Sequence, residues 1–128
     1  MFRRFMLAAA AALFASAALS SSAGADEFLG SYIARLSPAD HHASDGYRLD
    51  NAAQVVRQDR ANVHKFGRAD AEDEFDPWFG SAAARARFQS MLERNGAMSP
   101  ATRQAIMRGT PLVEVEVYVR KVVVSIIR

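Results

Sequence analysis

The sequence predicts a small α+β domain in which a short antiparallel sheet is covered by helices. Three observations lead to this fold class. Apolar residues recur with a helical period over residues 49–66, two more helical segments follow, and valines alternate strictly from residue 113 onward. Helices that lie together between two strands pack on one face of the sheet that those strands form. We therefore predict an N-terminal strand, three helices and a C-terminal strand that is bent or bulged near Arg120-Lys121.

Residues 1–25 have the pattern of a cleaved secretory signal peptide. Arg3 and Arg4 form a basic start, residues 5–19 are apolar or small, and Ala23-Gly24-Ala25 fits a small-x-small cleavage site. The apolar run is shorter than the roughly 20 residues that a transmembrane helix needs, so no transmembrane segment is expected after cleavage. Export by the general secretory route or by the twin-arginine route predicts a periplasmic or secreted protein; an uncleaved anchor is the alternative.

Residues 26–128 are expected to form a single small domain. Arg3 and Arg4 account for the formal charge of +2, so this part holds 14 basic and 14 acidic residues and gives no electrostatic argument for nucleic-acid binding. The chain has no cysteine, which excludes disulfides and thiolate zinc sites. Its stability must therefore come from a hydrophobic core.

The first element of the domain is a strand within residues 28–37, where Tyr32, Ala34 and Leu36 share one face. Pro38 ends the strand, because proline cannot donate to a ladder. A loop follows over residues 38–46.

An amphipathic helix is predicted over Leu49–Phe66, with Asp50 as its N-cap and Gly67 as the left-handed residue that closes it. Asp59 and Arg60 fall inside the apolar stripe of this helix, where a simple amphipathic pattern would place two more apolar residues. We expect this ionic pair to be the feature around which the domain is organised.

Residues 68–76 contain five acidic residues without apolar periodicity, which predicts a solvated loop. The second helix begins either with Asp76 as cap, or after a turn with Ser81 as cap. The third helix runs from Ser99-Pro100 to Gly109.

The C-terminal segment begins as a half-buried strand, in which the odd-numbered valines 113–119 face one way. The phase slips at Arg120-Lys121, because apolar residues then occupy the even positions Val122, Val124 and Ile126. A straight strand through this whole segment would extend roughly 50 Å, too long for the domain. Either a bulge or bend redirects it, or its end pairs with a partner. Tyr32–Leu36 and Leu112–Tyr118 are expected to pair.

One candidate ligand-binding face lies on the predicted helix 49–66. It comprises Arg57, Arg60 and His64, which could hold a carboxylate or phosphate, together with Asp59. Burial of an unpaired charge costs several kcal/mol, whereas a paired charge with hydrogen bonds can be tolerated. We therefore expect Asp59 and Arg60 first of all to tie the helix to neighbouring loops, and a ligand site is the alternative.

No metal site, cofactor or catalytic residue is assigned. His41, His42 and His64 are the plausible nitrogen ligands, but they form no HExxH or HxH pattern. Counted from Asp70, the acidic loop lacks the glycine and the bidentate glutamate of a calcium-binding loop. There is no GxSxG or SxxK motif and no glycine-rich phosphate loop.

The segments YIARLSPADHH, RQDRANVHKFG, EDEFDPWF and RGTPLVEVEVYV resemble small exported bacterial proteins of unknown function. This resemblance implies no activity, cofactor or site. We expect a non-catalytic protein that binds another envelope protein or a second copy of itself through a C-terminal interaction edge at Val122, Val124 and Ile126. A small-ligand, anion or metal binder is the first alternative, and an unrecognised hydrolase is the second.

Overall fold

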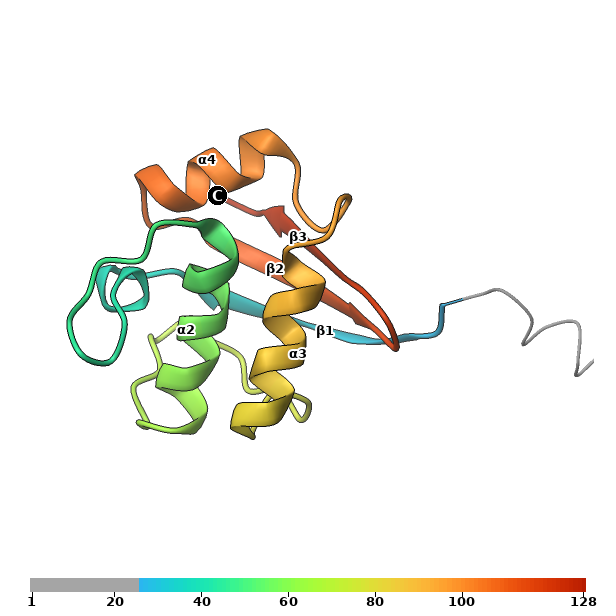
Figure 1. Ribbon diagram of the computed structural model, residues 1–128, viewed down its shortest axis with the longest axis horizontal. Helices are drawn as coiled ribbons and strands as arrows, with labels where there is room; N and C mark the ends of the chain where they lie inside the picture. Colours follow the sequence, from blue (N-terminus) through green and yellow to red (C-terminus); the bar gives the residue numbers. More distant parts are fainter. Residues whose placement is uncertain (1–25) are drawn as a thin grey trace, which may run out of the picture.

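The computed structural model describes residues 26–128; the predicted signal peptide, its cleavage after Ala25 and the export route concern residues outside this range. The described chain forms a three-stranded sheet with three α-helices on one side (Figure 1). This confirms the predicted α+β class. In chain order the elements are β1 (Phe28–Arg35), the 3-10 helix η1 (Pro38–His41), α2 (Ala52–His64), α3 (Ala82–Leu92), α4 (Pro100–Arg108), β2 (Leu112–Tyr118) and β3 (Val122–Ile126).

The sheet has the order β1-β2-β3, so β2 lies in its centre. Strand β1 pairs antiparallel with β2, as predicted, and the structure places Tyr32 opposite Val115. Strand β3 pairs antiparallel with the other side of β2, with Val124 also opposite Val115. The valines of β2 therefore meet inward-facing residues from both neighbours, which is the arrangement that period-two alternation requires.

The phase slip at Arg120 and Lys121 is a hairpin turn, in which the Tyr118 amide donates to the Lys121 carbonyl over 2.9 Å. The chain reverses here completely, so the final apolar segment forms a separate strand of the same sheet. Val119, expected on the buried face, belongs to this turn and is 52% exposed. A bulge does occur, but in β1 between Phe28 and Gly30.

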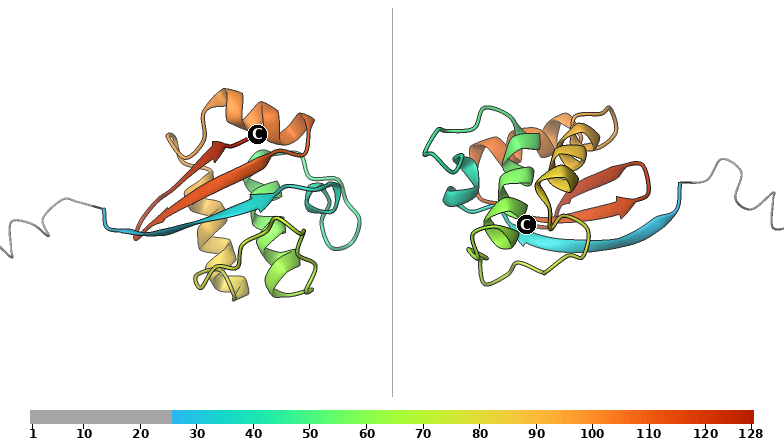
Figure 2. Two further views of the ribbon diagram at one scale, coloured as in Figure 1. Left: turned by 180° about the vertical axis from the view of Figure 1, so that it is seen from behind. Right: turned by 60° about the horizontal axis from the view of Figure 1, so that its bottom comes forward.

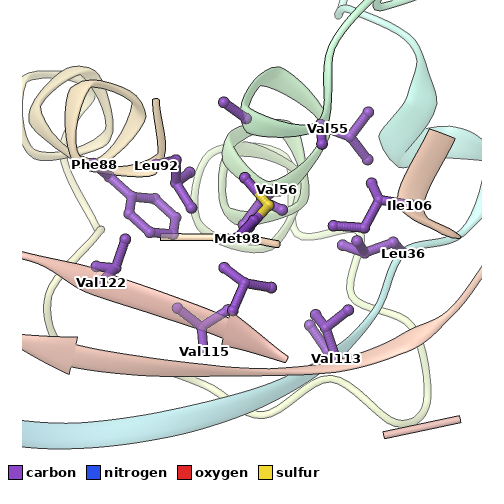
Figure 3. Close-up of a cluster of buried hydrophobic side chains, with 14 of the residues drawn as sticks. Leu36, Val55, Val56, Phe88, Leu92, Met98, Ile106, Val113, Val115 and Val122 are labelled. Carbon is purple, nitrogen blue, oxygen red and sulfur yellow. The ribbon is translucent and has the colours of Figure 1, made fainter. Parts of the chain in front are cut away.

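The hydrophobic core fills the space between the helices and one face of the sheet (Figure 3). Val55 and Val56 of α2, Phe88 of α3 and Ile106 of α4 face Val115 of β2 across this layer. Each of these larger side chains contributes roughly 1.5–3 kcal/mol on burial. No helix of residues 26–128 covers the opposite face of the sheet, as the view from behind shows (Figure 2).

Helix α2 starts later than expected. Its N-cap is Asn51, whose side chain accepts a hydrogen bond from the Gln54 amide over 2.9 Å, and not the predicted Asp50. Both residue types cap helices well, so composition alone does not distinguish them. Gly67 has a left-handed φ of +63°, as predicted, but the helix ends earlier than expected, at His64, with Lys65 as its C-cap.

Helix α3 is capped by Ser81, which confirms the second of the two predicted starts. Asp76 instead closes a turn, where its Oδ2 accepts from the amides of Trp78 and Phe79 over 2.9 and 2.7 Å. Arg85 of α3 is buried and donates to the Phe79 carbonyl.

The acidic loop between α2 and α3 is not simply solvated, because it covers the outer edge of β1. The Ile33 amide donates to Glu74 Oε1 over 2.7 Å, and the Arg35 amide donates to Asp73 Oδ1 over 2.8 Å. The Glu74 amide in turn donates to the Ile33 carbonyl over 2.8 Å. Carboxylates therefore replace a neighbouring strand along this part of the edge.

Candidate functional site

The ionic pair of α2 lies in the interior, between that helix, β1 and the acidic loop. Arg60 is 0% exposed, and its Nε donates to Asp59 Oδ2 over 2.7 Å. Its Nη1 donates to Asp76 Oδ1 and to the Glu74 carbonyl, each over 2.9 Å. The guanidinium carbon also lies 4.0 Å from the centre of the Tyr32 ring, within the range of a cation–π contact. One buried side chain thus links three segments of the chain.

Asp76 is the second centre of this network, and it is 1% exposed. Its Oδ1 accepts from Arg60 and lies 2.7 Å from His64 Nε2. Burial alone would raise the pKa of Asp76, but hydrogen bonds from His64, Arg60 and the Phe79 amide outweigh it and hold that pKa below its usual value. Asp76 is therefore a charged residue of the interior that fixes the chain ahead of α3.

Three of the four predicted ligand-binding residues meet in this network, whereas Arg57 does not. Asp59, Arg60 and His64 are joined through Arg60 and Asp76. Arg57 donates to Gln89 Oε1 on α3 over 2.8 Å and lines a shallow hollow between α2 and α3. The candidate cationic face is therefore not continuous. Arg60 and His64 bind Asp76, whereas Arg57 lies at the hollow between α2 and α3.

A second group of acidic residues lies beside the ionic pair. Asp40 of η1, Asp59 of α2 and Asp70 of the acidic loop each place one carboxylate oxygen within 4.8 Å of the other two. Asp40 and Asp59 are each 1% exposed, and Asp70 is partly buried. Sequence reasoning missed this cluster, because its members come from three segments whose packing no local pattern predicts.

Burial raises the pKa of Asp40 to about 6, although hydrogen bonds from Asn62 and Ser37 oppose the shift. Burial also raises the pKa of Asp59, against the attraction of Arg60. The neighbouring carboxylates add to both shifts through like-charge repulsion. A negative charge on either carboxylate is therefore less stable here than on an exposed aspartate.

Among residues 26–128, three buried side-chain atoms have no hydrogen-bond partner. They are Tyr32 Oη, Asp59 Oδ1 and Arg60 Nη2. A buried polar atom without a partner costs roughly 1–3 kcal/mol. All three belong to the ionic network, so this region carries an energetic cost that the rest of the described core avoids.

The histidines of η1 and its C-cap are not ordinary loop residues. His41 is buried, with its ring nitrogens 2.8 and 2.7 Å from the carbonyl oxygens of Ser37 and Ile106. His42 is half-buried, and its Nδ1 lies 3.0 Å from the Pro38 carbonyl. His41 therefore links η1 to α4, and its ring nitrogens already have backbone partners.

The residues of the predicted interaction edge lie on β3, an edge strand of the sheet. The side chains of Val122 and Val124 are 1% and 3% exposed and point into the core. The Lys121 carbonyl and the Ile127 amide form hydrogen bonds with β2. In an antiparallel pair every second residue bonds the neighbouring strand, so the backbone groups of Val122, Val124 and Ile126 point away from β2. The Val124 amide uses this direction to donate to the Ala97 carbonyl over 2.8 Å.

Two hollows flank the Ala97 contact along β3. The larger one has a volume of about 500 Å³ and lies beside Ile126. Its lining carries no charge: Gly96, Ala97, Ser99, Ala101, Thr102, Val123, Val124, Ser125 and Ile126. The smaller one, of about 180 Å³, lies beside Val122 and includes the basic residues Arg94 and Lys121.

Comparison with known proteins adds no relative from which a role could be carried over. No family model matches the chain, and no curated protein or solved structure is significantly similar to it. Within residues 26–128, none of the helices combines the length and the apolar character needed to cross a membrane.

Proposed function

We propose that the protein is a small exported, non-catalytic protein, periplasmic or secreted, that binds an extended segment of another exported protein along the outer edge of β3. The bound segment adds a fourth strand to the sheet. The observation that carries this proposal is the outward direction of the backbone groups of Val122, Val124 and Ile126, between two hollows. Main-chain hydrogen bonds supply affinity in this binding mode, and pockets for alternate side chains supply specificity.

The contrast between the two edges of the sheet supports the choice of β3. Edge strands with free amides and carbonyls invite pairing with other chains, and proteins commonly cover them. Carboxylates of the acidic loop cover β1 at Ile33 and Arg35. On β3, within residues 26–128, the Val124 amide alone of the outward backbone groups has a backbone partner, the Ala97 carbonyl.

The chemistry of the hollows indicates the kind of segment that fits. The lining beside Ile126 consists of small or apolar, uncharged residues, which favours a segment with small, uncharged side chains. Arg94 and Lys121 beside the other hollow favour an acidic side chain at that end.

A peptide-selection experiment tests the binding mode. Peptides selected from a random library should perturb the amide resonances of Val122 to Ile126. Ala101→Lys places a charge at the rim of the uncharged hollow, on an exposed residue of α4, and should weaken binding of a selected peptide tenfold or more. Ala86→Lys, on an exposed residue of α3, is the matched control and should leave affinity unchanged.

The molar mass of the protein in solution distinguishes binding of a partner protein from pairing with a second copy of the chain. A monomer that binds selected peptides at β3 supports the proposal. A dimer that dissociates with Ala101→Lys would replace the partner protein by a second copy. Peptides that bind equally well to Ala101→Lys, or that perturb only other residues, would refute binding at this edge.

Export is tested separately from binding. The whole chain fused to a reporter enzyme that is active only outside the cytoplasm should give activity, and the mature protein should begin at Asp26. A protein recovered from the cytoplasm with residues 1–25 intact would contradict the proposed location.

A further inference from the structure

We propose that Asp40, Asp59 and Asp70 bind a divalent cation, with Ca²⁺ as the ion that fits best. The three carboxylates come from η1, α2 and the acidic loop, and each contributes an oxygen within 4.8 Å of the other two. Carboxylate oxygens are the ligands that Ca²⁺ and Mg²⁺ prefer. This site is distinct from the proposed edge on β3, and the two proposals do not depend on each other.

The origin of the ligands in three separate segments favours Ca²⁺ over Mg²⁺, which demands near-ideal octahedral geometry. Oxygens bound to one Ca²⁺ at about 2.4 Å lie at most about 4.8 Å apart. The three carboxylate oxygens all lie within 4.8 Å of one another and so meet this condition. Ca²⁺ also accepts irregular coordination, which suits ligands from three separate segments.

A second observation points to a ligand independently of the cluster itself. Asp59 is 1% exposed, and its buried Oδ1 has no hydrogen-bond partner among residues 26–128. Its Oδ2 is held by Arg60 Nε over 2.7 Å, which fixes the orientation of the carboxylate. A cation on the free oxygen would compensate the cost of burying it.

The other two carboxylates are also held in place by hydrogen bonds. Asp40 Oδ1 accepts from Asn62 Nδ2 over 2.8 Å, and Asp40 Oδ2 accepts from the Ser37 amide over 2.9 Å. A carboxylate oxygen can accept such a bond and still bind a cation, because it has two lone pairs.

A turn of the acidic loop positions Asp70. The Asp70 amide donates to Asp73 Oδ2 over 2.8 Å, and the Asp73 amide donates back to the Asp70 carbonyl over 3.0 Å. Ligands that are held in this way lose little freedom when a metal binds.

The balance of charge supports a cation as the missing partner. Asp40, Asp59, Asp70 and Asp73 influence one another, and the cation that attracts Asp59 is Arg60, which Asp76 shares. Burial and these neighbours raise the pKa of both Asp40 and Asp59. A divalent ion would relieve this repulsion and would tie the acidic loop to α2 and η1.

Calorimetric titration of the untagged protein, purified from cells that express the whole chain, with calcium chloride tests the site. We expect one equivalent of Ca²⁺ to bind, to raise the melting temperature, and to be removed by a chelator. Magnesium chloride should bind more weakly. No heat of binding and no shift in melting temperature at millimolar calcium chloride would overturn the proposal, and so would preferential binding of zinc.

Asp70→Asn is the informative variant, because Asp70 lies in a loop and is only partly buried. It should weaken Ca²⁺ binding tenfold or more without preventing folding. Asp45→Asn, a matched change at an exposed aspartate in another loop, should leave binding unchanged. Equal Ca²⁺ affinity in Asp70→Asn and the unmodified protein would refute the assigned ligands.

Discussion

At the scale of single residues, the domain is unusual in placing an arginine among its most buried side chains. Arg60 is tolerated there because Asp59, Asp76 and the Glu74 carbonyl accept its hydrogen bonds. Such a pair is weak evidence for net stabilisation, but removing one partner leaves an uncompensated buried charge. The ionic network therefore makes the fold sensitive to changes at a few positions.

Asp59→Ala should lower the free energy of unfolding by about 3 kcal/mol at neutral pH, because it leaves the buried Nε of Arg60 without an acceptor. Urea unfolding followed by circular dichroism measures the change. A melting temperature equal to that of the unmodified protein would show that this residue does not stabilise the network.

Asp76→Asn should have an effect that depends on pH. Hydrogen bonds from His64 and Arg60 hold the pKa of the folded Asp76 below its usual value despite burial. Asp76 therefore contributes stability above its unfolded pKa of about 3.9, and this contribution is lost as the pH falls through the folded pKa. The variant should be about 3 kcal/mol less stable at pH 7, and the difference should narrow below about pH 4. Urea unfolding at several pH values measures it, and a difference that stays constant down to pH 3 would contradict this role.

At the scale of elements, local patterns predicted what local interactions determine. Helix α2 was recognised from its period, and Ser99 and Gly109 marked the ends of α4, because caps satisfy the free amides and carbonyls of a helix. The hairpin between β2 and β3 was seen only as a slip of phase. Its turn, Val119-Arg120-Lys121, contains no glycine or asparagine, the residues that typically indicate a hairpin turn.

The acidic loop shows how tertiary contacts override composition. Its charge predicted exposure to solvent, yet two of its carboxylates accept amide hydrogen bonds from β1. A strand edge offers amides to any acceptor that reaches it. Which loop reaches this edge depends on the path between α2 and α3, and the sequence contains no local sign of it.

Glu74→Ala should therefore speed hydrogen exchange of the Ile33 amide roughly tenfold, because that amide loses its acceptor. Exchange measured by nuclear magnetic resonance reports this single position. Glu93→Ala removes an exposed carboxylate at the end of α3 and serves as control. An unchanged Ile33 rate in Glu74→Ala would mean that another group protects the amide.

At the scale of the whole molecule, the sheet has one face covered by helices (Figure 2). Its two edges differ in how they are closed, because side-chain carboxylates bind the β1 edge and a loop carbonyl binds the β3 edge. The sequence predicted the covered face from the alternation of the β2 valines. It could not predict the cluster of Asp40, Asp59 and Asp70, because three distant segments meet there only once the sheet and helices have packed. Asp59 and Arg60 could be recognised in the sequence as an ionic pair on α2, but Asp76 could not be recognised as the partner of Arg60.

Removal of residues 122–128 should abolish cooperative folding. Strand β3 forms one side of the β2 ladder and buries Val122 and Val124 in the core. Each buried valine contributes roughly 1.5–3 kcal/mol, and a small domain has a total stability of only about 5–15 kcal/mol. Thermal unfolding followed by circular dichroism should lose its sigmoidal transition. Removal of Arg128 alone, whose side chain is 71% exposed, should preserve it. A truncated protein that still melts cooperatively would show that β1, β2 and the helices form a stable unit without β3, and the strand would then be a detachable element instead of part of the core.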